Sequence, residues 1–326
     1  MFAEPHFSPS LKLFLNRDAN SRDNPGLIAY LLQSSDTRVV FYHDGRLATR
    51  NEELALFSIP ELALSASGSE LQDLGIVIYL GKDSGHTYLG ICLNDDALAG
   101  DMGIEGIGSK AILDFLAIEL NFTSLRLLLS QLDGLTKDIA MIMSALGNWH
   151  KNQPFCPVCG ELSEPSQSGW SRTCKKGGHE TFPRTDPAVI MAVFDQNERL
   201  LLAQNALWED ARYSVLAGFI EAGEDASSAV KREVAEEVGL AVTSSAFVTT
   251  QSWPFPGSLM LAYNAWVSDS EFVIDGKEIA QARWFEAQEL HDAAQSGQVQ
   301  LPGQTSVAWK LIELWLKGFG LTLKGR

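Results

Sequence analysis

Three glutamates in the C-terminal half of the chain are the residues best placed to do chemistry. Glu233, Glu236 and Glu237 have the i, i+3 and i+4 spacing that puts side chains on one face of a helix. Three carboxylates this close repel one another unless a cation lies between them. Acidic, oxygen-rich sites suit Mg²⁺ or Mn²⁺, which also bind phosphate oxygens. We therefore expect a divalent-cation site here; the alternative is an acidic helix face that is simply solvated.

The helix that must carry these glutamates has clear ends. Asp225 is a good N-cap residue and Gly239 a good C-terminal stop, so the sequence predicts a helix between them. Three valines form an apolar stripe beside the acidic face, and this stripe can pack the helix on a sheet. They are Val230, Val234 and Val238.

The segment from Gly218 to Leu240 matches the Nudix box, G-x5-E-x7-R-E-U-x-E-E-x-G-U with U apolar, at every fixed position. Its fixed charged residues include Glu224 and Arg232. Proteins with this box resemble one another in hydrolysing a nucleoside diphosphate linked to another moiety. The resemblance implies pyrophosphate hydrolysis, with the substrate left to other parts of the chain.

Length and composition limit the remaining possibilities. A chain of 326 residues with 45% hydrophobic residues is long enough for two domains with separate cores. No apolar run approaches the roughly 20 residues that span a bilayer, and the N-terminus has no secretory pattern, so we expect no membrane partner. The net charge of −16 disfavours nonspecific binding to nucleic acid. An acidic protein that acts on phosphates needs metal ions to offset the repulsion.

Three of the four cysteines are clustered, a pattern that favours a metal site and a reducing cytoplasm over disulfides. Cys156 and Cys159 form a C-x2-C knuckle, and Cys174 follows. Gly177 stands where a second knuckle would place its last ligand, so we expect His179 to complete a structural Cys3His zinc site. The alternative is a degenerate ribbon without metal. The fourth cysteine, Cys92, is expected to be a buried strand residue.

The rest of the chain predicts two α/β units around this ribbon. The first reads as mixed α/β, with paired strands at 75–81 and 86–93, helices at 109–120 and 124–151, and a loop at 103–110. Residues 154–182 are too poor in aliphatics to fold on a hydrophobic core. Beyond Pro183, strand-like segments surround the box helix and a final helix spans about 305–317, which predicts an α/β sandwich. The segments are 187–195, 198–205, 214–220, 246–253, 258–267 and 281–285.

A proline-rich aromatic stretch, TQSWPFPGS at 250–258, follows the box. Its stiff loop could cradle a stacked base, or it could be a turn that packs on the core. It closely resembles the S-Q-P-W-P-F-P-x-S array of NADH pyrophosphatases, and departs from it at Thr250 and Ser252. With the ribbon, the box and the C-terminal TSVAWKLI, the chain resembles that family of Nudix hydrolases over most of its length.

The resemblance implies a fold and a division of the chain. We expect an N-terminal Nudix-like α/β domain without an active box at 1–150, a small zinc ribbon at 151–182, and a catalytic Nudix α/β/α sandwich at 183–326.

The resemblance also implies the metal site. Glu233, Glu236 and Glu237 would bind Mg²⁺ or Mn²⁺ or orient the attacking water, while Arg232 would fix these glutamates by ion pairing. The carbonyl of Ala217 and the carboxylate of Glu278 would complete the cation sites. The alternative for Glu278 is an exposed loop acid.

The implied substrate residues are scattered along the chain. Phe182 and Phe219 would flank the nicotinamide, although both could equally be core aromatics. One acidic position that contacts substrate in relatives is here Gly169. The remaining substrate residues are Arg126, Gln251, Ser252, Trp253, Pro254, Phe255, Pro256, Gly257, Ser258 and Ala308.

The sequence thus predicts a homodimeric, cytoplasmic, metal-dependent hydrolase that splits NAD(H) into NMN(H) and AMP. Removal of NAD caps from RNA 5′ ends is the alternative activity, by the same chemistry. A catalytically dead nucleotide sensor is the non-enzymatic alternative, although such proteins usually lose box glutamates that this chain keeps.

Overall fold

The chain divides by its internal packing into two units, which are described separately. The computed structural model describes residues 14–62, 69–94, 121–208 and 210–323. The described residues of the first unit lie within Thr185–Trp253 and Ser258–Arg326. Those of the second lie within Ser10–Arg184 and Pro254–Gly257. The short loop at 254–257 therefore packs with the second unit although its flanking strands belong to the first.

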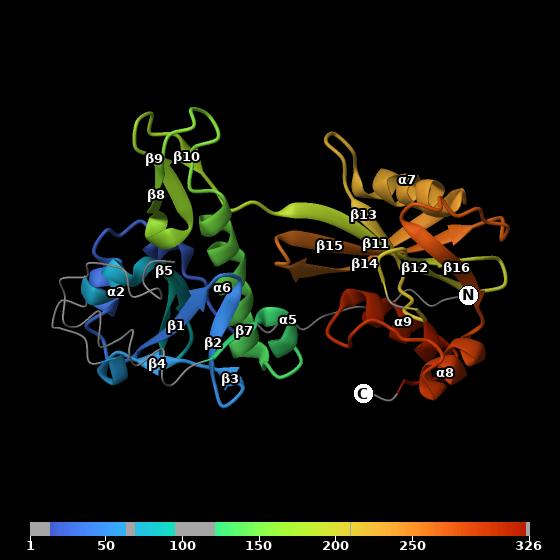
Figure 1. Cartoon of the computed structure of the whole chain (residues 1–326), viewed down its shortest axis with the longest axis horizontal. Helices are drawn as coiled ribbons and strands as arrows, with labels where there is room; N and C mark the ends of the chain where they lie inside the picture. Colours follow the sequence, from blue (N-terminus) through green and yellow to red (C-terminus); the bar gives the residue numbers. More distant parts are fainter. Residues whose placement is uncertain (1–13, 63–68, 95–120, 209, 324–326) are drawn as a thin grey trace. The chain divides into compact units, whose positions relative to one another are not determined.

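The first unit is built on a six-stranded mixed sheet of order β14-β15-β11-β12-β16, with β13 paired to β11 (Figure 1). Its central strands β11 and β15 are parallel, and the other pairs are antiparallel. The strands are β11 (Asp186–Phe194), β12 (Leu200–Asn205), β13 (Leu216–Phe219), β14 (Val242–Trp253), β15 (Ser258–Val267) and β16 (Ile279–Phe285). The helices are α7 (Ala226–Val238), α8 (Ala287–Ser296) and α9 (Val307–Gly318).

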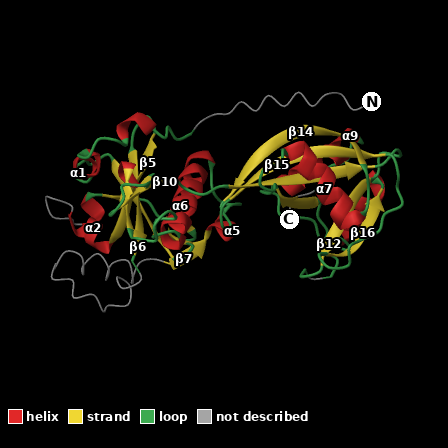
Figure 2. Ribbon diagram, turned by 90° about the horizontal axis from the view of Figure 1, so that it is seen from above, coloured by secondary structure: helices red, strands yellow, loops and turns green. Residues whose placement is uncertain are grey.

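Alternate residues of the buried strands face two separate cores, because side chains on a strand point to opposite faces in turn. On β11, Val189, Met191 and Val193 pack with α7, whereas Ile190, Ala192 and Phe194 pack with α8 and α9. Figure 2 shows α7 lying across one face of this sheet. The predicted sandwich with helices on both faces is confirmed.

The box helix α7 has the ends that its sequence predicts. The Asp225 side chain accepts hydrogen bonds from the backbone N–H groups of Ser227 and Ser228, at 2.9 and 3.0 Å. At the other end Gly239 has φ 68°, the left-handed conformation that glycine adopts without strain. The predicted valine stripe is fully buried in the core beneath the helix.

The second unit contains a seven-stranded sheet of order β3-β2-β1-β6-β5, with β4 paired to β1 and β7 to β2. Its strands are β1 (Thr37–His43), β2 (Arg46–Arg50), β3 (Glu53–Leu54), β4 (Phe57–Ser58), β5 (Gly75–Lys82), β6 (Thr87–Leu93) and β7 (Asn121–Ser124). Its helices are η1 (Ala19–Ser21), α1 (Leu27–Leu31), η2 (Pro60–Leu62), α2 (Ser69–Leu74), α5 (Leu125–Leu128) and α6 (Gly134–Asn152). Cys92 is buried in β6, as predicted.

The two sheets share one topology. In both, a central parallel pair, β1 with β6 or β11 with β15, is flanked by antiparallel partners. The equivalent pairs are β1 and β11, β2 and β12, β4 and β13, β5 and β14, β6 and β15, and β7 and β16. A short helix, α2, stands where the second copy has the long box helix α7. The expected N-terminal Nudix-like α/β domain is confirmed, and this copy of the fold carries no glutamate cluster on the equivalent helix.

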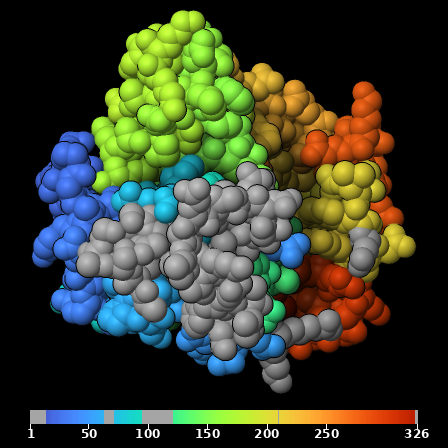
Figure 3. Space-filling view, turned by 60° about the vertical axis from the view of Figure 1, so that its left-hand side comes forward, coloured from blue at the N-terminus to red at the C-terminus, as the bar shows by residue number. Residues whose placement is uncertain are grey.

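The ribbon belongs to the second unit and forms a yellow-green projection on it (Figure 3). Its sheet, of order β10-β9-β8, comprises β8 (Ser163–Ser166), β9 (Ser171–Cys174) and β10 (Glu180–Thr181), with η3 (Gln167–Gly169) between the first two. Trp170 attaches it to the N-terminal sheet, since its indole N–H donates to the carbonyl of Tyr79 at 2.6 Å.

Some predicted helices differ from the structure. The continuous helix expected at 124–151 is wrong, because β7 ends at Ser124 and a new helix, α6, begins after Asp133, whose side chain accepts from the Thr136 backbone N–H. The last helix begins two residues late, where Ser306 caps it. Helix α8 was not predicted. The loop at 103–110 and the helix at 109–120 lie outside the described residues.

None of the helices in the segments that the structure describes is both long and apolar enough to cross a membrane.

Candidate active site and metal centres

Arg232 is the centre of the charged cluster on α7. Its Nε and one terminal nitrogen donate to both carboxylate oxygens of Glu224, at 2.9 and 2.8 Å. The other terminal nitrogen donates to Glu233 and to Glu236, each at 2.9 Å. A fifth bond, of 2.8 Å, goes to the Phe219 carbonyl. These bonds use all five guanidinium N–H groups, so Arg232 positions the acids rather than binding substrate.

The pKa shifts follow from these bonds. Hydrogen bonding from Arg232 lowers the pKa of Glu224, and the bonded acids raise that of Arg232. The role of Glu224 was missed in the sequence, although its fixed position in the box was visible.

Glu237 is a buried acid of the cluster that is surrounded by other negative charges. The residue is 5% exposed, and its Oε2 atom is buried without a hydrogen-bond partner among the described residues. Burial, and then the negative charges of Glu278, Glu233, Asp275 and Glu236, raise the pKa of Glu237 to about 8. A buried carboxylate oxygen that lacks a donor and faces other carboxylates is what a divalent cation would satisfy. The donor set therefore fits Mg²⁺ or Mn²⁺.

Gly218 explains why the box begins with glycine. A Cβ atom at this position would lie 1.9 Å from the Glu233 Cδ atom and 2.0 to 2.3 Å from the two carboxylate oxygens. Strand β13, which carries Gly218, pairs with β11 and contacts α7. The missing side chain is the space that the Glu233 carboxylate occupies, and burial raises the pKa of that carboxyl despite the Arg232 ion pair.

A cavity of about 380 Å³ opens beside this cluster. That volume is within the ordinary range for small-molecule sites. The lining combines acids with apolar surface and includes six of the residues implied by the resemblance. It consists of Ala188, Ala217, Gly218, Phe219, Glu221, Arg232, Glu233, Ser258, Met260 and Glu278.

The predicted metal ligands differ in exposure. The Glu236 side chain is 59% exposed and bonded to Arg232, and Glu278 is exposed at the cavity rim. Ala217, whose carbonyl was expected to bind metal, lies on β13 opposite Ile190. Of the five predicted ligands, Ala217, Glu233 and Glu278 line the cavity, whereas Glu236 and Glu237 are not among its lining residues.

The two phenylalanines expected to flank a nicotinamide are surface residues. Phe219 is 60% exposed and lines the cavity of the first unit. Phe182, at the end of the ribbon in the second unit, is 61% exposed. The alternative that both are core aromatics is therefore wrong.

Gln251, at the start of the aromatic array, is bound to the N-terminus of α9. Its side-chain N–H donates to the Thr305 carbonyl at 2.7 Å, and its side-chain oxygen accepts from the Val307 backbone N–H at 2.7 Å. The amide thus holds the first turn of α9. Ala308, on that turn, is 5% exposed and packs in the core. Neither side chain lines the cavity described above.

The rest of the aromatic array is divided between the units. Trp253 ends β14 opposite Ser258, the first residue of β15. Ser252 is exposed, Pro254 is buried, and Pro256 and Gly257 complete the loop that packs with the second unit. There the Arg126 guanidinium lies 5.2 Å from the centre of the Phe255 ring, a cation–π distance.

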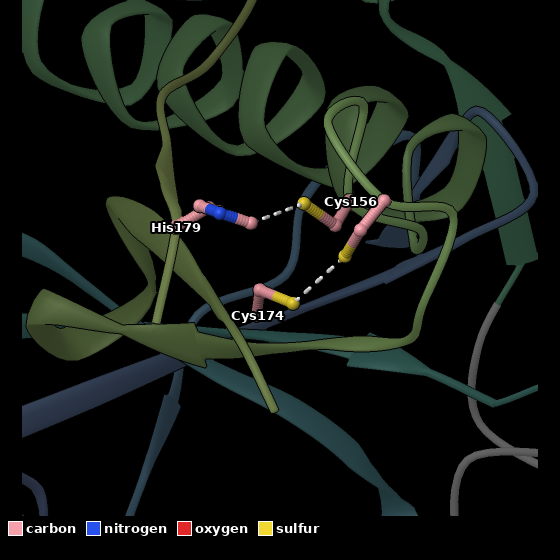
Figure 4. Close-up of side chains that lie close together, drawn as sticks. Cys156, Cys174 and His179 are labelled. Carbon is pink, nitrogen blue, oxygen red and sulfur yellow. Dashed lines mark hydrogen bonds between the residues drawn. The ribbon is translucent and has the colours of Figure 1, made fainter. Parts of the chain in front are cut away.

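The four ribbon residues converge as predicted. Ligand atoms of Cys156, Cys159, Cys174 and His179 all lie within 4.8 Å of one another. The Cys156 Sγ atom is 3.4 Å from His179 Nδ1, and the Sγ atoms of Cys159 and Cys174 are 3.4 Å apart (Figure 4). Four protein ligands are the number that fills the tetrahedral coordination of a structural zinc site.

Gly177 and the backbone support this set. A Cβ atom at Gly177 would lie 2.5 Å from the His179 ring, so the histidine fills the space beside the glycine that replaces a second knuckle ligand. The Gly177 backbone N–H donates to Cys174 Sγ at 3.4 Å, and this bond is the main reason that the pKa of Cys174 is lowered to about 6. A thiol that ionises readily is a good zinc ligand.

Gly169, which replaces an acidic position of relatives, is required by its surroundings. Its φ is +89°, and a Cβ atom would lie 2.8 Å from the Ile78 side chain. Its carbonyl lies 2.8 Å from Nε2 of the buried His150. An acidic side chain at this position would therefore have to displace Ile78 and adopt a strained backbone conformation.

Comparison with known proteins supports both domains. Residues 184–302 match the family described as NUDIX domain, and residues 151–182 match the NADH pyrophosphatase zinc ribbon domain. The family resemblance predicted from the box and the cysteine cluster is confirmed over these ranges.

Curated relatives align with a little more than half of the chain. The NAD-capped RNA hydrolase NudC of Mycobacterium tuberculosis is 41% identical over 56% of this chain and 62% of its own length. The human NAD-capped RNA hydrolase NUDT12 is 36% identical over 55% of this chain and 41% of its own. The chain thus spans less than two thirds of either relative. A NUDIX hydrolase structure from Nitrosomonas europaea aligns with 53% of this chain and 97% of its own at 19% identity, with a TM-score of 0.43.

Proposed function

We propose that this chain, which contains a NUDIX domain and an NADH pyrophosphatase zinc ribbon domain, hydrolyses the pyrophosphate bond of NAD(H) to NMN(H) and AMP. The observation that carries the proposal is the partnerless, buried Glu237 oxygen among four other acids, beside a cavity that also presents an exposed aromatic ring, Phe219. Divalent cations would bind the carboxylates, and a dinucleotide would stack on the Phe219 ring.

The chemistry is a balanced hydrolysis. A water oxygen bonds to one phosphorus, the bond from that phosphorus to the bridging oxygen breaks, and the two monophosphates leave. When bound, the divalent cations neutralise charge on the phosphate oxygens and make the attacking water more acidic. Glu237, or a neighbouring glutamate, accepts the water proton. Arg232 holds Glu224, Glu233 and Glu236 in place throughout, because its donors are all engaged.

Substrate selection falls to the aromatic residues. Phe219, at the cavity, offers an exposed ring on which a nicotinamide can stack. Trp253 and Ser258 flank the loop at 254–257, and Ser258 also lines the cavity.

The ribbon is proposed to hold one structural Zn²⁺ through Cys156, Cys159, Cys174 and His179. Its scarcity of apolar residues supports this role, since metal binding would supply the folding free energy that a hydrophobic core supplies elsewhere.

Removal of NAD caps from RNA is the second candidate activity. The names of the mycobacterial and human relatives favour it. It would use the same glutamates, with the RNA chain leaving the cavity through an open side. The expectations of a homodimer and of a cytoplasmic location remain predictions, to be checked by light scattering of the purified protein and by fractionation of cells.

A substrate panel tests the proposal. NADH, NAD⁺, NADPH, ADP-ribose and NAD-capped RNA would be incubated with Mg²⁺ and with Mn²⁺, and products identified by mass spectrometry. Release of NMNH and AMP from NADH supports the proposal, and faster turnover of capped RNA would favour the second activity. Tight NADH binding without hydrolysis in either metal would instead indicate the nucleotide sensor.

A further inference from the structure

The loop at 254–257, which carries the middle of the aromatic array, is held by a residue of α6. The Asn148 side-chain nitrogen donates to the Pro254 carbonyl at 3.1 Å and lies 3.4 Å from the Pro256 carbonyl, which also accepts. Both contacts lie within the second unit. The loop thus receives these two hydrogen bonds from the domain that has no active box.

The orientation of the Asn148 amide is itself fixed. The Tyr42 hydroxyl donates to the Asn148 side-chain oxygen at 2.7 Å, so the amide nitrogen must face the loop. Tyr42 is 2% exposed. Its ring packs closely against Gly147 of α6, since a Cβ atom at Gly147 would lie 2.4 Å from the ring. The buried tyrosine and the helix therefore leave the amide little freedom.

The loop has few means of holding its own shape. Pro254 and Pro256 have no N–H, so only Phe255 and Gly257 could donate from the backbone of these four residues. Its ends are the last residue of β14 and Ser258, which lines the catalytic cavity. A shift in the loop would therefore be felt at the cavity wall through one covalent link.

We propose that Asn148, oriented by Tyr42, is a positioning residue for substrate recognition and that it acts by holding the loop at 254–257. The inference rests on the proposed function. Asn148 acts on the carbonyls of Pro254 and Pro256 and not on the substrate, so its loss changes affinity before it changes the chemical step.

The test uses the full chain and three variants. Asn148→Asp keeps the shape and the bond from Tyr42, but it removes the donor and places a carboxylate against two carbonyl oxygens. Tyr42→Phe removes only the hydroxyl that orients the amide. Asn152→Asp is the matched control, since Asn152 is an exposed asparagine on the same helix. For each protein, kcat and KM for NADH are measured, together with hydrogen–deuterium exchange of a peptide containing Phe255 and Gly257.

We expect Asn148→Asp to raise KM for NADH about threefold to tenfold, the effect of losing one or two net hydrogen bonds. Its kcat should stay within about twofold of the wild type, and exchange in the loop should accelerate. Tyr42→Phe should change both quantities in the same direction by less, and the control should match the wild type.

The outcomes separate the positioning role from the activity. Unchanged loop exchange in Asn148→Asp overturns the proposal, whether or not KM rises, because a KM effect without loop release means direct contact with substrate. A fall in kcat alone also overturns it. Failure of the wild type to hydrolyse NADH removes the proposed function, but loop exchange still decides whether Asn148 holds the loop.

Discussion

Replacing Gly218 by alanine adds one methyl group at the point where β13 passes the catalytic helix. The new Cβ atom would lie 1.9 Å from the Glu233 Cδ atom, whereas real Cβ contacts below 3.0 Å are essentially never found. The Glu233 carboxylate must therefore move by roughly 1 Å. Gly218 does not have a positive φ, so the backbone accepts alanine. The carboxylate is the far end of a flexible side chain, so we expect it to be displaced while the fold is kept.

A displacement of this size matters because a catalytic group misplaced by about 1 Å can cost about 10²-fold in rate. We expect Gly218→Ala to lower kcat for pyrophosphate hydrolysis by about that factor at saturating Mg²⁺ or Mn²⁺. The melting temperature should stay close to that of the wild type. Gly303→Ala is the matched control, because a Cβ atom there meets nothing within 4 Å. Wild-type turnover in Gly218→Ala would show that the Glu233 position is not needed for catalysis.

Three other predictions test the remaining parts of the site. Glu237→Gln should lower kcat about 10²–10⁴-fold with the fold intact by circular dichroism, and near-normal turnover at saturating metal would refute the assignment. Cys156→Ser should lower both the zinc content and the melting temperature, because the ribbon depends on metal binding to fold. Wild-type protein that contains less than about half an equivalent of zinc by mass spectrometry would contradict the ribbon site. If His179→Ala keeps its full zinc content, only the assignment of the fourth ligand is wrong. Phe219→Ala should raise KM for NADH severalfold and that for ADP-ribose less, since stacking contributes about 0.5–1.5 kcal/mol, and equal losses would mean that the ring supports the fold.

The catalytic helix could be read from the sequence because each of its features is local. A capping Asp225, a stop at Gly239 and an i, i+3, i+4 acid pattern lie within one segment, and the structure reproduces all three. The break at Asp133 was also local, since its capping box with Thr136 is visible in the sequence, but the apolar period on either side concealed it.

Contacts between distant segments could not be read in this way. The amide of Gln251 binds Thr305 and Val307, which lie more than fifty positions away, and nothing in the array points to these contacts. Asn148, on α6, gave no signal, because an asparagine in a helix has no motif that points to a loop about one hundred positions later. The partners of such residues can be identified only in the folded structure, where distant segments lie side by side.

The lining of the cavity supports the proposal that this acidic chain uses cations to act on a diphosphate. Arg232 is the only basic residue among those that line the cavity, and all five of its N–H groups already bind Glu224, Glu233, Glu236 and the Phe219 carbonyl. No side-chain cation of the lining is therefore left to neutralise phosphate oxygens. Divalent cations bound at the cavity would supply the charge that offsets them, and the partnerless Glu237 oxygen is a group that such an ion would satisfy. The way the arginine is used therefore supports the proposed metal dependence.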